Sequence, residues 1–416
     1  MGLSGIEPIL QDKLAELERQ GTGKGDELVV SGIKAAGNGF GPRCYLAGQG
    51  GVEFLRMNSN SYLGLGLHPA VIAAEEEAVR DFGAGPGAVR FISGTHAAHL
   101  ELEARLARFH NRAAAMLFSS AYATVMGVLP QLIDADTAVV SDSLNHNCII
   151  NAIRLAWPVA KVVYGHNDLV DLESRLRELV GRAKRLVVVC DGVFSMRGDH
   201  APLDQLVALC RRYEERFVQG IITVVDDSHG VGAFGATGRG TEEETGARAD
   251  ILVGTLGKAF GVNGGYVATS AILVRFLRET APFYVYSNPI TPAEAVAAQR
   301  AVEILDSAAG RELLARLRSL TRRLEAGLVE LGFEIIAGPH PIVPLLVRDT
   351  ARTARLVAHL FSHGILATGI KFPVVPRGEE EIRFQVNASH TEADIDLLLG
   401  VLAAWPDRTT GAARGD

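Results

Sequence analysis

Between about residues 111 and 270 the chain alternates short apolar, β-branched runs with amphipathic helical patterns. Strands are expected at residues 113–120, 137–142, 160–166, 185–193, 220–229, 249–258 and 264–270. Leucines at helical spacing lie between several of them, for example over 169–179. Continuously apolar strands separated by helices indicate a mostly parallel seven-stranded sheet with both faces covered. The pattern therefore predicts an α/β fold, and ligands of such folds bind beyond the carboxyl ends of the strands.

The pattern changes after about residue 290. Helices are expected over 291–305, along the leucines from 313 to 331, and at about 351–362 and 391–404. Short strands are expected near 333–337, 342–348, 365–370 and 381–387. A chain of 416 residues is long enough for two or three domains. We expect an N-terminal arm or helix (1–55), a large domain (56–290), a small α+β domain (291–405) and a flexible tail (406–416).

The composition argues against several classes of protein. The formal net charge is −7, and a nucleic-acid-binding protein would be expected to carry a basic patch. The cysteines at 44, 148, 190 and 210 form no CxxC pair, which predicts reduced thiols and no metal site. The apolar spacing over 6–17 predicts an amphipathic helix, and no apolar run reaches the roughly 20 residues of a membrane span. We expect a cytoplasmic protein without a membrane partner.

A lysine and an acidic residue stand at the ends of two expected strands. Lys258 lies in GTLGKAFGVNGG, where neighbouring glycines let a flat ligand approach the backbone. A lone lysine after a strand is usually a solvated surface residue, and the alternative that the glycines raise is a Schiff-base lysine. Asp226 ends the strand at 220–229; it either caps a turn or keeps a pyridine nitrogen protonated, as pyridoxal-phosphate (PLP) chemistry requires.

Three further polar residues follow strands of the same sheet. His229 comes three residues after Asp226 and can hydrogen-bond the phenolic oxygen of the cofactor. His146, in SDSLNHNCI, is either a structural histidine or an imidazole stacked on the cofactor ring. Ser195, in CDGVFSMRG, offers a hydroxyl at the same level. The carboxyl ends of these strands meet at one edge, so the side chains are expected to lie together.

A phosphate group and a carboxylate also need partners. Ser120, Ala121 and Tyr122 form a strand-to-helix turn whose N–H groups can bind a phosphate, and Thr255 can add its hydroxyl. Arg383, in EEEIRFQVNASH, is expected either in a surface ion pair with the glutamates at 379–381 or as a bidentate clamp on a substrate carboxylate. The side chain of a turn residue, Asn60, can share that carboxylate.

Taken together, the motifs resemble those of a known enzyme family. The segments are NSNSYLGLGLHP, AVRFISGT, SDSLNHNCII, DGVFSM, VVDDSHGVGAFGATGRGT, GTLGKAFG and EEIRFQVNASHT. In this order, from about residue 57 to 390, they resemble the α-oxoamine synthases, which are fold-type I PLP enzymes. The resemblance implies an acyltransferase that joins a small amino acid to an acyl-CoA or acyl-carrier-protein thioester.

The resemblance also implies roles for individual residues. Lys258 would hold the cofactor as an imine, Asp226 would pair with the pyridine nitrogen, and His229 and His146 would contact the ring. The phosphate would be held by Ser120, Ala121, Tyr122 and Thr255. The amino-acid carboxylate would be held by Asn60 and Arg383. Ser287 and Asn288 match the segment that reaches the cofactor phosphate of a neighbouring subunit, which implies a homodimer.

The motifs look most like the glycine C-acetyltransferase branch, and somewhat less like the 8-amino-7-oxononanoate synthases. Departures from the family pattern are Pro86, Arg197, Pro289 and Asn387, which lie near the expected ligand path. They leave open the acyl group and the amino acid, not the cofactor. Other readings are a secondary-metabolite synthase with a longer acyl donor, a fold-type I aminotransferase or aldolase, and a non-catalytic partner subunit. Such subunits typically lack the imine lysine.

Overall fold

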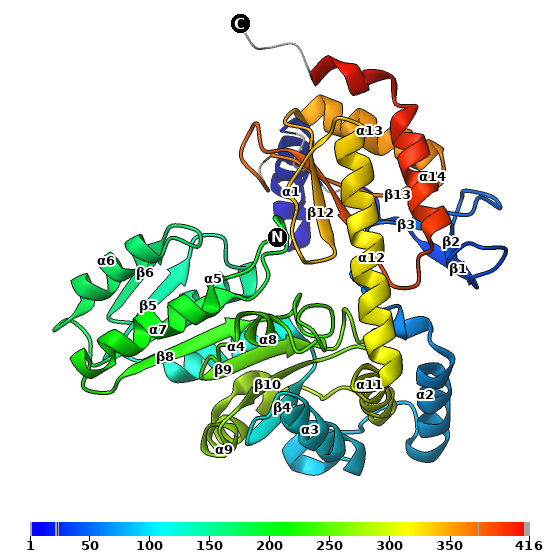
Figure 1. Cartoon of the computed structure of the whole chain (residues 1–416). Coiled ribbons are helices and arrows are strands. Elements are labelled where there is room, and N and C mark those ends of the chain that lie inside the picture. The colour runs from blue at the N-terminus through cyan, green and yellow to red at the C-terminus, as the bar shows by residue number, and fades with distance from the viewer. Residues whose placement is uncertain (1, 21–22, 24, 373, 412–416) are drawn as a thin grey trace, which may run out of the picture.

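The structure is a computed structural model that describes residues 2–20, 23, 25–372 and 374–411. A larger domain is built on a seven-stranded sheet, and a smaller C-terminal domain packs above it in Figure 1. The long helix α12 (Ala308–Glu330) runs from one domain into the other, with α11 (Pro292–Leu305) before it. The predicted fold class is therefore correct, while the boundaries at 55, 290 and 405 stay a prediction.

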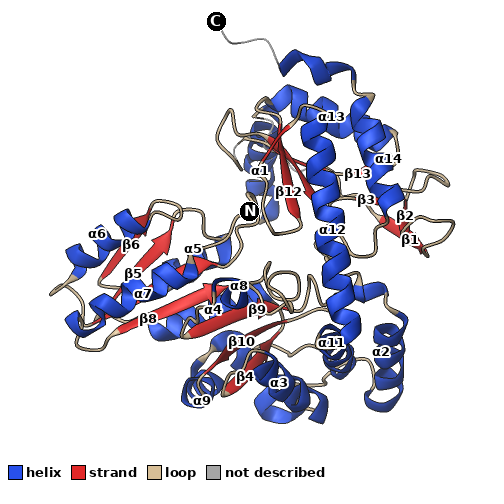
Figure 2. Ribbon diagram, in the orientation of Figure 1, coloured by secondary structure: helices blue, strands red, loops and turns tan. Residues whose placement is uncertain are grey.

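The larger sheet contains every strand that the sequence predicted for it. Its order is β4 (Ala114–Phe118), β10 (Gly265–Thr269), β9 (Ile251–Thr255), β8 (Ile221–Asp226), β7 (Arg185–Asp191), β5 (Thr137–Asp142), β6 (Ala160–Tyr164). Strand β10 is antiparallel to both neighbours, and the pairs among β6, β5, β7, β8 and β9 are parallel. Figure 2 shows the strands between blue helices.

Alternate residues of the strands supply two cores, one on each face of the sheet. Val140 and Val188 belong to the larger core, whereas their neighbours Val139 and Val187 belong to the smaller one. The alternation follows from the two-residue period of a strand. The larger core includes residues of α2 (Pro69–Phe82), α3 (Ala97–Phe109), α6 (Leu169–Leu179) and α7 (Leu203–Tyr213). The smaller core includes residues of α4 (Ala121–Leu132), α5 (Asn147–Leu155), α9 (Ala271–Thr280) and α10 (Pro282–Val285).

The smaller domain is an α+β unit. Its antiparallel sheet has the order β11 (Glu334–Ile335), β12 (Ile342–Leu346), β15 (Glu381–Gln385), β14 (Thr368–Ile370). The helices α13 (Thr350–Ser362) and α14 (Glu392–Ala403) accompany it. Short helical segments elsewhere are η1 (Leu65–Leu67), η2 (Arg90–Gly94), η3 (Glu214–Arg216), α8 (Thr241–Thr245) and η4 (Pro406–Gly411). The end of the predicted tail, 412–416, lies outside the described residues.

The N-terminal strands lie beside the smaller domain. After α1 (Leu3–Arg19), the strands β1 (Val30–Lys34) and β2 (Arg43–Leu46) pair with each other. The strand β3 (Leu55–Arg56) pairs in parallel with β13 (Ile365–Leu366). The single strand predicted at 365–370 is therefore wrong in detail, because β13 pairs with β3 and β14 with β15. A partner more than 300 positions away cannot be inferred from local composition.

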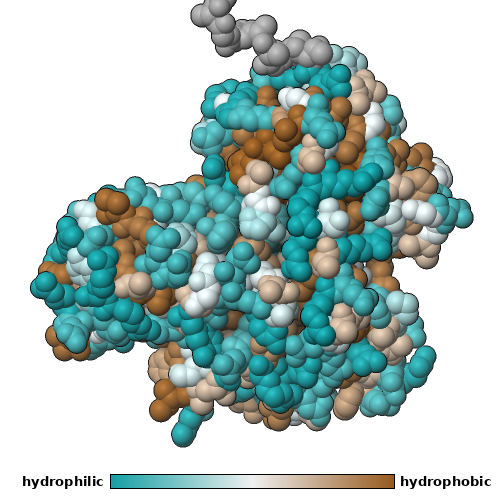
Figure 3. Space-filling model, in the orientation of Figure 1, coloured by the Kyte–Doolittle hydropathy of each residue, from teal (hydrophilic) through white to brown (hydrophobic). Residues whose placement is uncertain are grey.

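The predicted amphipathic helix at the N-terminus is α1, and none of its residues is buried. Its apolar side chains are exposed, among them Leu3 (75%) and Leu14 (60%). Figure 3 shows apolar side chains gathered on the smaller domain, in the upper part of the view. Among the described residues, no helix combines the length and the hydropathy that crossing a bilayer requires.

Candidate active site

A small cavity opens at the carboxyl edge of the larger sheet, beyond β7, β8 and β9. Its volume is about 50 Å³. The lining side chains are Ala121, Tyr122, His146, Cys148, Asp191, Val193, Ser195, Asp226, Ser228, His229 and Lys258. The sheet therefore brings together the lysine, the aspartate, both histidines and the serine that the sequence singled out. This is the edge at which α/β folds bind ligands.

Lys258 lies in a tight turn three residues beyond the end of β9. The turn is closed by a hydrogen bond from Leu256 N to Gly264 O at 2.9 Å, and Gly261 has the positive φ of 73° that a side chain would disfavour. Burial lowers the pKa of the Lys258 amine, and the nearby carboxylate of Asp226 opposes that effect. A lowered pKa increases the neutral fraction of the amine, and only the neutral amine is a nucleophile or a base.

Asp226 is the last residue of β8 and is held by three donors. Its Oδ1 accepts hydrogen bonds from the backbone N–H of Ser228 at 3.1 Å and from the Ser228 hydroxyl at 2.5 Å. The thiol of Cys148 donates to Oδ2 at 3.6 Å. These bonds fix the orientation of the Asp226 carboxyl group at the cavity. Among the described residues, only the thiol of Cys148 donates a hydrogen bond to Oδ2.

His229 is connected to Asn60 through a tyrosine. The Tyr62 hydroxyl lies 2.8 Å from His229 Nδ1 and 3.3 Å from Asn60 Oδ1. Burial holds the pKa of His229 well below its usual range, so that the imidazole is neutral. Asn60 itself does not line the cavity but meets it through this chain of contacts.

His146 caps the N-terminus of α5. Its Nδ1 accepts a hydrogen bond from the backbone N–H of Cys148 at 3.3 Å, and the Cys148 sulfur lies 3.0 Å from the same atom. The backbone N–H of His146 donates to Asp191 Oδ2 at 3.1 Å. Burial lowers the pKa of His146. The ring is therefore neutral, with Nδ1 as the acceptor, and its position is fixed from two sides.

The turn predicted to hold a phosphate is the first turn of α4. Ser120 is its N-cap, and the Ser120 hydroxyl accepts from Ala123 N at 3.1 Å. Ala121 and Tyr122 line the cavity, where the N-terminus of a helix favours an anion. Gly265 on β10 packs so closely that a Cβ there would overlap the backbone of Ser120 and Ala121. The backbone at this point is therefore open to a ligand only because residue 265 is glycine.

Thr255 has a local bonding role in the structure. Its hydroxyl donates to Gly264 O at 3.2 Å and accepts from Gly257 N at 3.1 Å. It is not among the side chains that line the cavity. Its hydrogen bonds support the turn that carries Lys258, and a direct contact with a phosphate stays a prediction.

Arg383 reaches across from the smaller domain on β15. Its Nη1 donates to Ser195 O at 2.9 Å, and the Gln385 carboxamide, with its oxygen turned toward the guanidinium, accepts from Nε at 2.6 Å. Among the described residues Arg383 forms no ion pair within 4.0 Å with the glutamates at 379–381. The surface ion pair is therefore the wrong alternative, and Arg383 instead contacts the backbone of Ser195, a residue of the cavity wall. Burial lowers its pKa.

Ser287 and Asn288 do not reach the cavity of their own chain. They follow α10 in a partly exposed segment, with Tyr286 beside them 80% exposed. Neither lines the Lys258 cavity. Their predicted contact with the phosphate of a neighbouring subunit stays a prediction.

A larger cleft of about 810 Å³ adjoins the cavity between the two domains. His146 and Ser195 line both spaces, so the cleft leads to the Lys258 amine. Its other walls are mostly apolar and include Leu144, Ile150, Phe194, Met196, Ile336, Leu346 and Val374. Arg197, one of the departures from the family pattern, also lines it. The cleft has room for an extended substrate beside the amine.

Sequence reasoning missed Tyr62, Cys148 and Asp191, which contact the predicted residues directly. Asp191 lies opposite Asp226 in the β7–β8 register, is 6% exposed, and has no hydrogen-bond partner for Oδ1 among the described residues. Burial, next to Asp226, raises the pKa of Asp191 well above its usual range. Asp191 could have been found from the sequence, because it ends a predicted strand just as Asp226 does. The contacts of Tyr62 and Cys148 could not have been found in this way.

These residues fit PLP. An amine with a lowered pKa can form the imine, a buried carboxylate can hold the pyridinium, a helix N-terminus can hold the phosphate, and two neutral imidazoles complete the walls. The chemistry that the sequence predicted therefore has the donors it needs within one cavity. The site defines the class of a fold-type I PLP-dependent transferase.

Comparison with known proteins agrees with that class. The family model described as aminotransferase class I and II matches residues 52–402. The 2-amino-3-ketobutyrate coenzyme A ligase, mitochondrial, of Bos taurus is 37% identical over 397 residues, 95% of this chain and 90% of the relative. An 8-amino-7-oxononanoate synthase of Bacillus pumilus is 39% identical over 350 residues, 84% and 87% of the two chains.

A solved structure of serine palmitoyltransferase from S. paucimobilis, with a PLP–myriocin aldimine, superimposes with a TM-score of 0.85 at 27% identity, covering 97% of this chain and 98% of that one. The chain belongs to the aminotransferase class I and II family and is an enzyme with PLP as its cofactor. Within that family it is an α-oxoamine synthase.

Proposed function

We propose that this enzyme condenses glycine with an acyl-CoA thioester to a 2-amino-3-oxo acid or the α-amino ketone derived from it. The observation that carries the proposal is that Lys258 and Asp226 line one cavity, which opens into the interdomain cleft, while Arg383 donates to the backbone carbonyl of Ser195 on the wall of that cavity. The Bos taurus relative, matched over 95% of this chain, supports a glycine C-acetyltransferase-like reaction. The 8-amino-7-oxononanoate synthase supports the alternative of a longer acyl donor.

The proposed residue roles follow from the contacts. Lys258 and Asp226 hold the cofactor, with Ser120, Ala121 and Tyr122 at its phosphate. When bound there, PLP supplies an electron sink for the bonds of the amino-acid α-carbon. Thr255, Ser195, His146 and His229 complete the cofactor-binding set. The cytoplasmic location belongs to the same proposal.

Arg383 and Asn60 bind the carboxylate of the amino acid. The Arg383 guanidinium is already oriented by Ser195 O and the Gln385 carboxamide, so little side-chain freedom is lost when the carboxylate binds. Asn60 lies beside the Tyr62 hydroxyl, which fixes the direction of its oxygen. A fixed carboxylate sets which bond of the α-carbon breaks.

The Nζ atom of Lys258 takes the α-proton as general base. Its lowered pKa favours the neutral amine, and general acid–base help of this kind is typically worth about 10²–10⁴-fold in rate. The α-carbon then attacks the thioester carbonyl, the new C–C bond forms, and the C–S bond breaks with release of the thiol. The apolar walls of the cleft exclude water from the thioester and so limit its hydrolysis.

A homodimer is part of the proposal. Large apolar side chains are exposed near the Ser287–Asn288 segment and on the loop at 90–94, where Phe91 is 62% and Ile92 65% exposed. Exposed apolar clusters of this kind mark interaction surfaces. Light scattering at micromolar concentration is expected to give twice the chain mass, and a monomer that is fully active would contradict the dimer.

The test of the reaction is a matrix of small amino acids against acyl-CoA thioesters of increasing chain length. Thiol release that requires both glycine and a thioester supports the proposal. Amino-group transfer to a keto acid without thiol release would instead indicate an aminotransferase. Retro-aldol cleavage of a β-hydroxy amino acid without a thioester would indicate an aldolase.

A further inference from the structure

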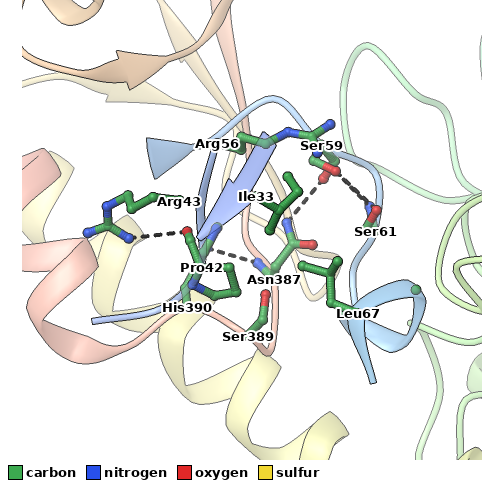
Figure 4. Close-up of a pocket in the computed structure, with 12 residues that line it drawn as sticks. Ile33, Pro42, Arg43, Arg56, Ser59, Ser61, Leu67, Asn387, Ser389 and His390 are labelled. Atoms are coloured by element: carbon green, nitrogen blue, oxygen red, sulfur yellow. Dashed lines mark hydrogen bonds between the residues drawn. The ribbon is translucent and has the colours of Figure 1, made fainter. Parts of the chain in front are cut away.

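A second cavity, of about 230 Å³, lies apart from the Lys258 site where three chain segments meet. We call it the hinge cavity. Its walls come from residues 33–43, from residues 56–67, and from residues 387–390 after β15. The segment 56–67 leads from β3, which pairs with the smaller domain, toward α2 of the larger domain. The hinge cavity therefore adjoins a crossing between the domains, and Figure 4 shows its side chains.

The hinge cavity carries positive charge without a carboxylate among its walls. Of its two arginines, Arg43 is neutralised by a buried ion pair, Nη2 to Asp394 Oδ1 at 2.6 Å. The side chain of Arg56 forms no hydrogen bond or ion pair within the described part of the chain, although it is partly buried. A guanidinium has five donor hydrogens that need acceptors. Arg56 therefore has no anionic partner among the residues that the structure describes.

Three hydroxyl groups line the same cavity as this arginine. Ser59 and Ser61 lie with their hydroxyl oxygens 3.1 Å apart, and Figure 4 shows both on the side of the cavity where Arg56 lies. Ser389 lines the cavity from the smaller domain, on the side opposite Arg56 in Figure 4. Hydroxyls rotate to donate to whichever acceptor is present. His390 adds no charge, because burial lowers its pKa to about 4.

We propose that the hinge cavity binds a small oxyanion, a phosphoryl group, with the Arg56 guanidinium as the charged anchor and the hydroxyls of Ser59, Ser61 and Ser389 as further donors. Arginine matches the planar pair of oxygens that a phosphoryl group presents. The volume of about 230 Å³ lies below the roughly 300–1,000 Å³ typical of drug-sized ligands. The occupant is therefore inorganic phosphate or the phosphate end of a larger molecule that extends out of the cavity.

An anion bound in the hinge cavity would affect the amino-acid site through residues 59–62, which contribute to both. Ser59 and Ser61 flank Asn60, whose Oδ1 lies 3.3 Å from the Tyr62 hydroxyl, and that hydroxyl contacts His229. An anion that fixes the two serines also fixes the residue between them. The inference stands independently of the proposed reaction, since it concerns a separate cavity.

The test measures binding of inorganic phosphate to the PLP-loaded enzyme by calorimetry, against chloride at the same ionic strength. The bound cofactor fills its own phosphate subsite, and loss of the signal in Arg56→Gln assigns the remaining binding to the hinge cavity and not to the arginines of the cleft. In Arg56→Gln the dissociation constant of phosphate is expected to rise about 10- to 100-fold, as for the loss of a charge-assisted hydrogen bond. No saturable binding to the native enzyme, or equal binding to Arg56→Gln, overturns the proposal.

A second variant guards against a folding defect in the first. Ser61→Asp places a carboxylate beside Arg56 and keeps the guanidinium, so it is expected to abolish phosphate binding while the thermal midpoint is retained. The matched control is Arg182→Gln, which removes an exposed arginine whose side chain forms no hydrogen bond or ion pair in the described chain. Unchanged phosphate binding in Ser61→Asp also overturns the proposal.

Two probes distinguish the sources of the phosphoryl group. Tighter binding of inorganic phosphate identifies a free anion, and tighter binding of adenosine 3′,5′-bisphosphate identifies the phosphate end of a nucleotide; both require Arg56. A different result is a change of oligomeric state in Arg56→Gln with no response to either probe. That result would mean that Arg56 pairs with a carboxylate of a second copy, and the hinge cavity would not be an anion site.

Discussion

At the scale of single residues, the site depends on groups whose charge is set by burial. Burial lowers the pKa of Lys258, and the carboxyl group of Asp226 nearby accepts hydrogen bonds from Ser228 and Cys148. The two histidines of the cavity are neutral because burial lowers their pKa values. One amine and one carboxyl group are therefore the pair around which the cofactor chemistry is arranged.

The first prediction concerns Lys258. Lys258→Ala removes the only amine of the cavity, so turnover is expected to fall by at least about 10³-fold, because imine formation and general-base help are lost together. The visible absorbance of the purified enzyme is expected to disappear, although PLP can still bind non-covalently. Turnover rates and visible absorption spectra of the native enzyme and the variant measure the two effects. A yellow, active Lys258→Ala protein would remove this residue from the cofactor link.

The second prediction concerns Arg383. Arg383→Ala is expected to raise the KM for the amino acid about 10- to 100-fold, because a charge-assisted hydrogen bond contributes about 1.5–3 kcal/mol. PLP content is expected to stay unchanged, since Arg383 belongs to the smaller domain and not to the cofactor walls. Initial rates at varied glycine concentration measure the effect. The control is Arg348→Ala on the cleft wall, where the guanidinium is paired with Glu334.

The chemistry of the site was predictable from the sequence because its residues stand at strand ends. Asp226 and His146 follow apolar runs, and the carboxyl ends of parallel strands converge at one edge. Cys148 was not predictable, because its contact with Asp226 depends on how α5 is placed against β8. Arg56 gave no signal at all: its lack of an anion becomes visible only when three distant segments form one cavity.

At the scale of elements, the N-terminus of α4 and the strand β10 pack directly against each other. The helix offers N–H groups to a phosphate, and β10 lies so close behind that residue 265 has no room for a side chain. The same strand is the one that runs against its neighbours in the sheet. An antiparallel strand thus brings a glycine against the helix N-terminus that is proposed to hold the phosphate.

The third prediction tests this contact. Gly265→Ala is expected to weaken PLP binding by at least tenfold, because a Cβ would push the first turn of α4 away from the phosphate. Fluorescence titration of the apo enzyme with PLP measures the affinity. Gly400→Ala is the matched control: this glycine lies in α14 with open space around it. There alanine is expected to stabilise the helix by about 0.5–1 kcal/mol and to leave PLP affinity unchanged.

The strands of the larger sheet were predictable, and part of the smaller domain was not. The strands of the larger sheet are short apolar runs bounded by turns, and several are rich in β-branched residues, such as Arg185–Asp191. The residues at 365–370 carry the same local signal, yet they divide between β13 and β14. The partner of β13 is β3, near the N-terminus, and the partner of β14 is β15, near the C-terminus. Strand composition can be inferred locally, whereas partner choice over hundreds of residues cannot.

At the scale of the whole molecule, one buried charge network makes stability depend on pH. His166 bonds to Asp142 Oδ1 at 3.1 Å and to Asp199 Oδ2 at 3.0 Å. Burial alone would lower its pKa, but the hydrogen bonds to both carboxylates dominate and raise it to about 9. The unfolded value is about 6.5. Since the folded pKa is the higher one, the stabilisation is complete below pH 6.5 and is lost as the pH rises through 9.

The fourth prediction follows from that sign. His166→Gln is expected to lower the urea midpoint of unfolding clearly at pH 6 and much less at pH 9.5, where the native histidine is itself losing its charge. Equal losses at the two pH values would indicate a packing effect instead of a charge effect. His363→Gln is the control, because this exposed histidine has no carboxylate partner in the described structure.

The parallel pair of β3 and β13 has a consequence for synthesis on the ribosome. Leu55 and Arg56 are translated about 300 residues before Ile365 and Leu366, which they pair with. Long-range pairing of this kind is slow to form and exposes its edges until the partner arrives. The larger sheet can assemble as the nascent chain emerges, whereas β3 can pair only after β13 has been synthesised. Chaperone demand during expression is therefore expected to fall on the first 56 residues.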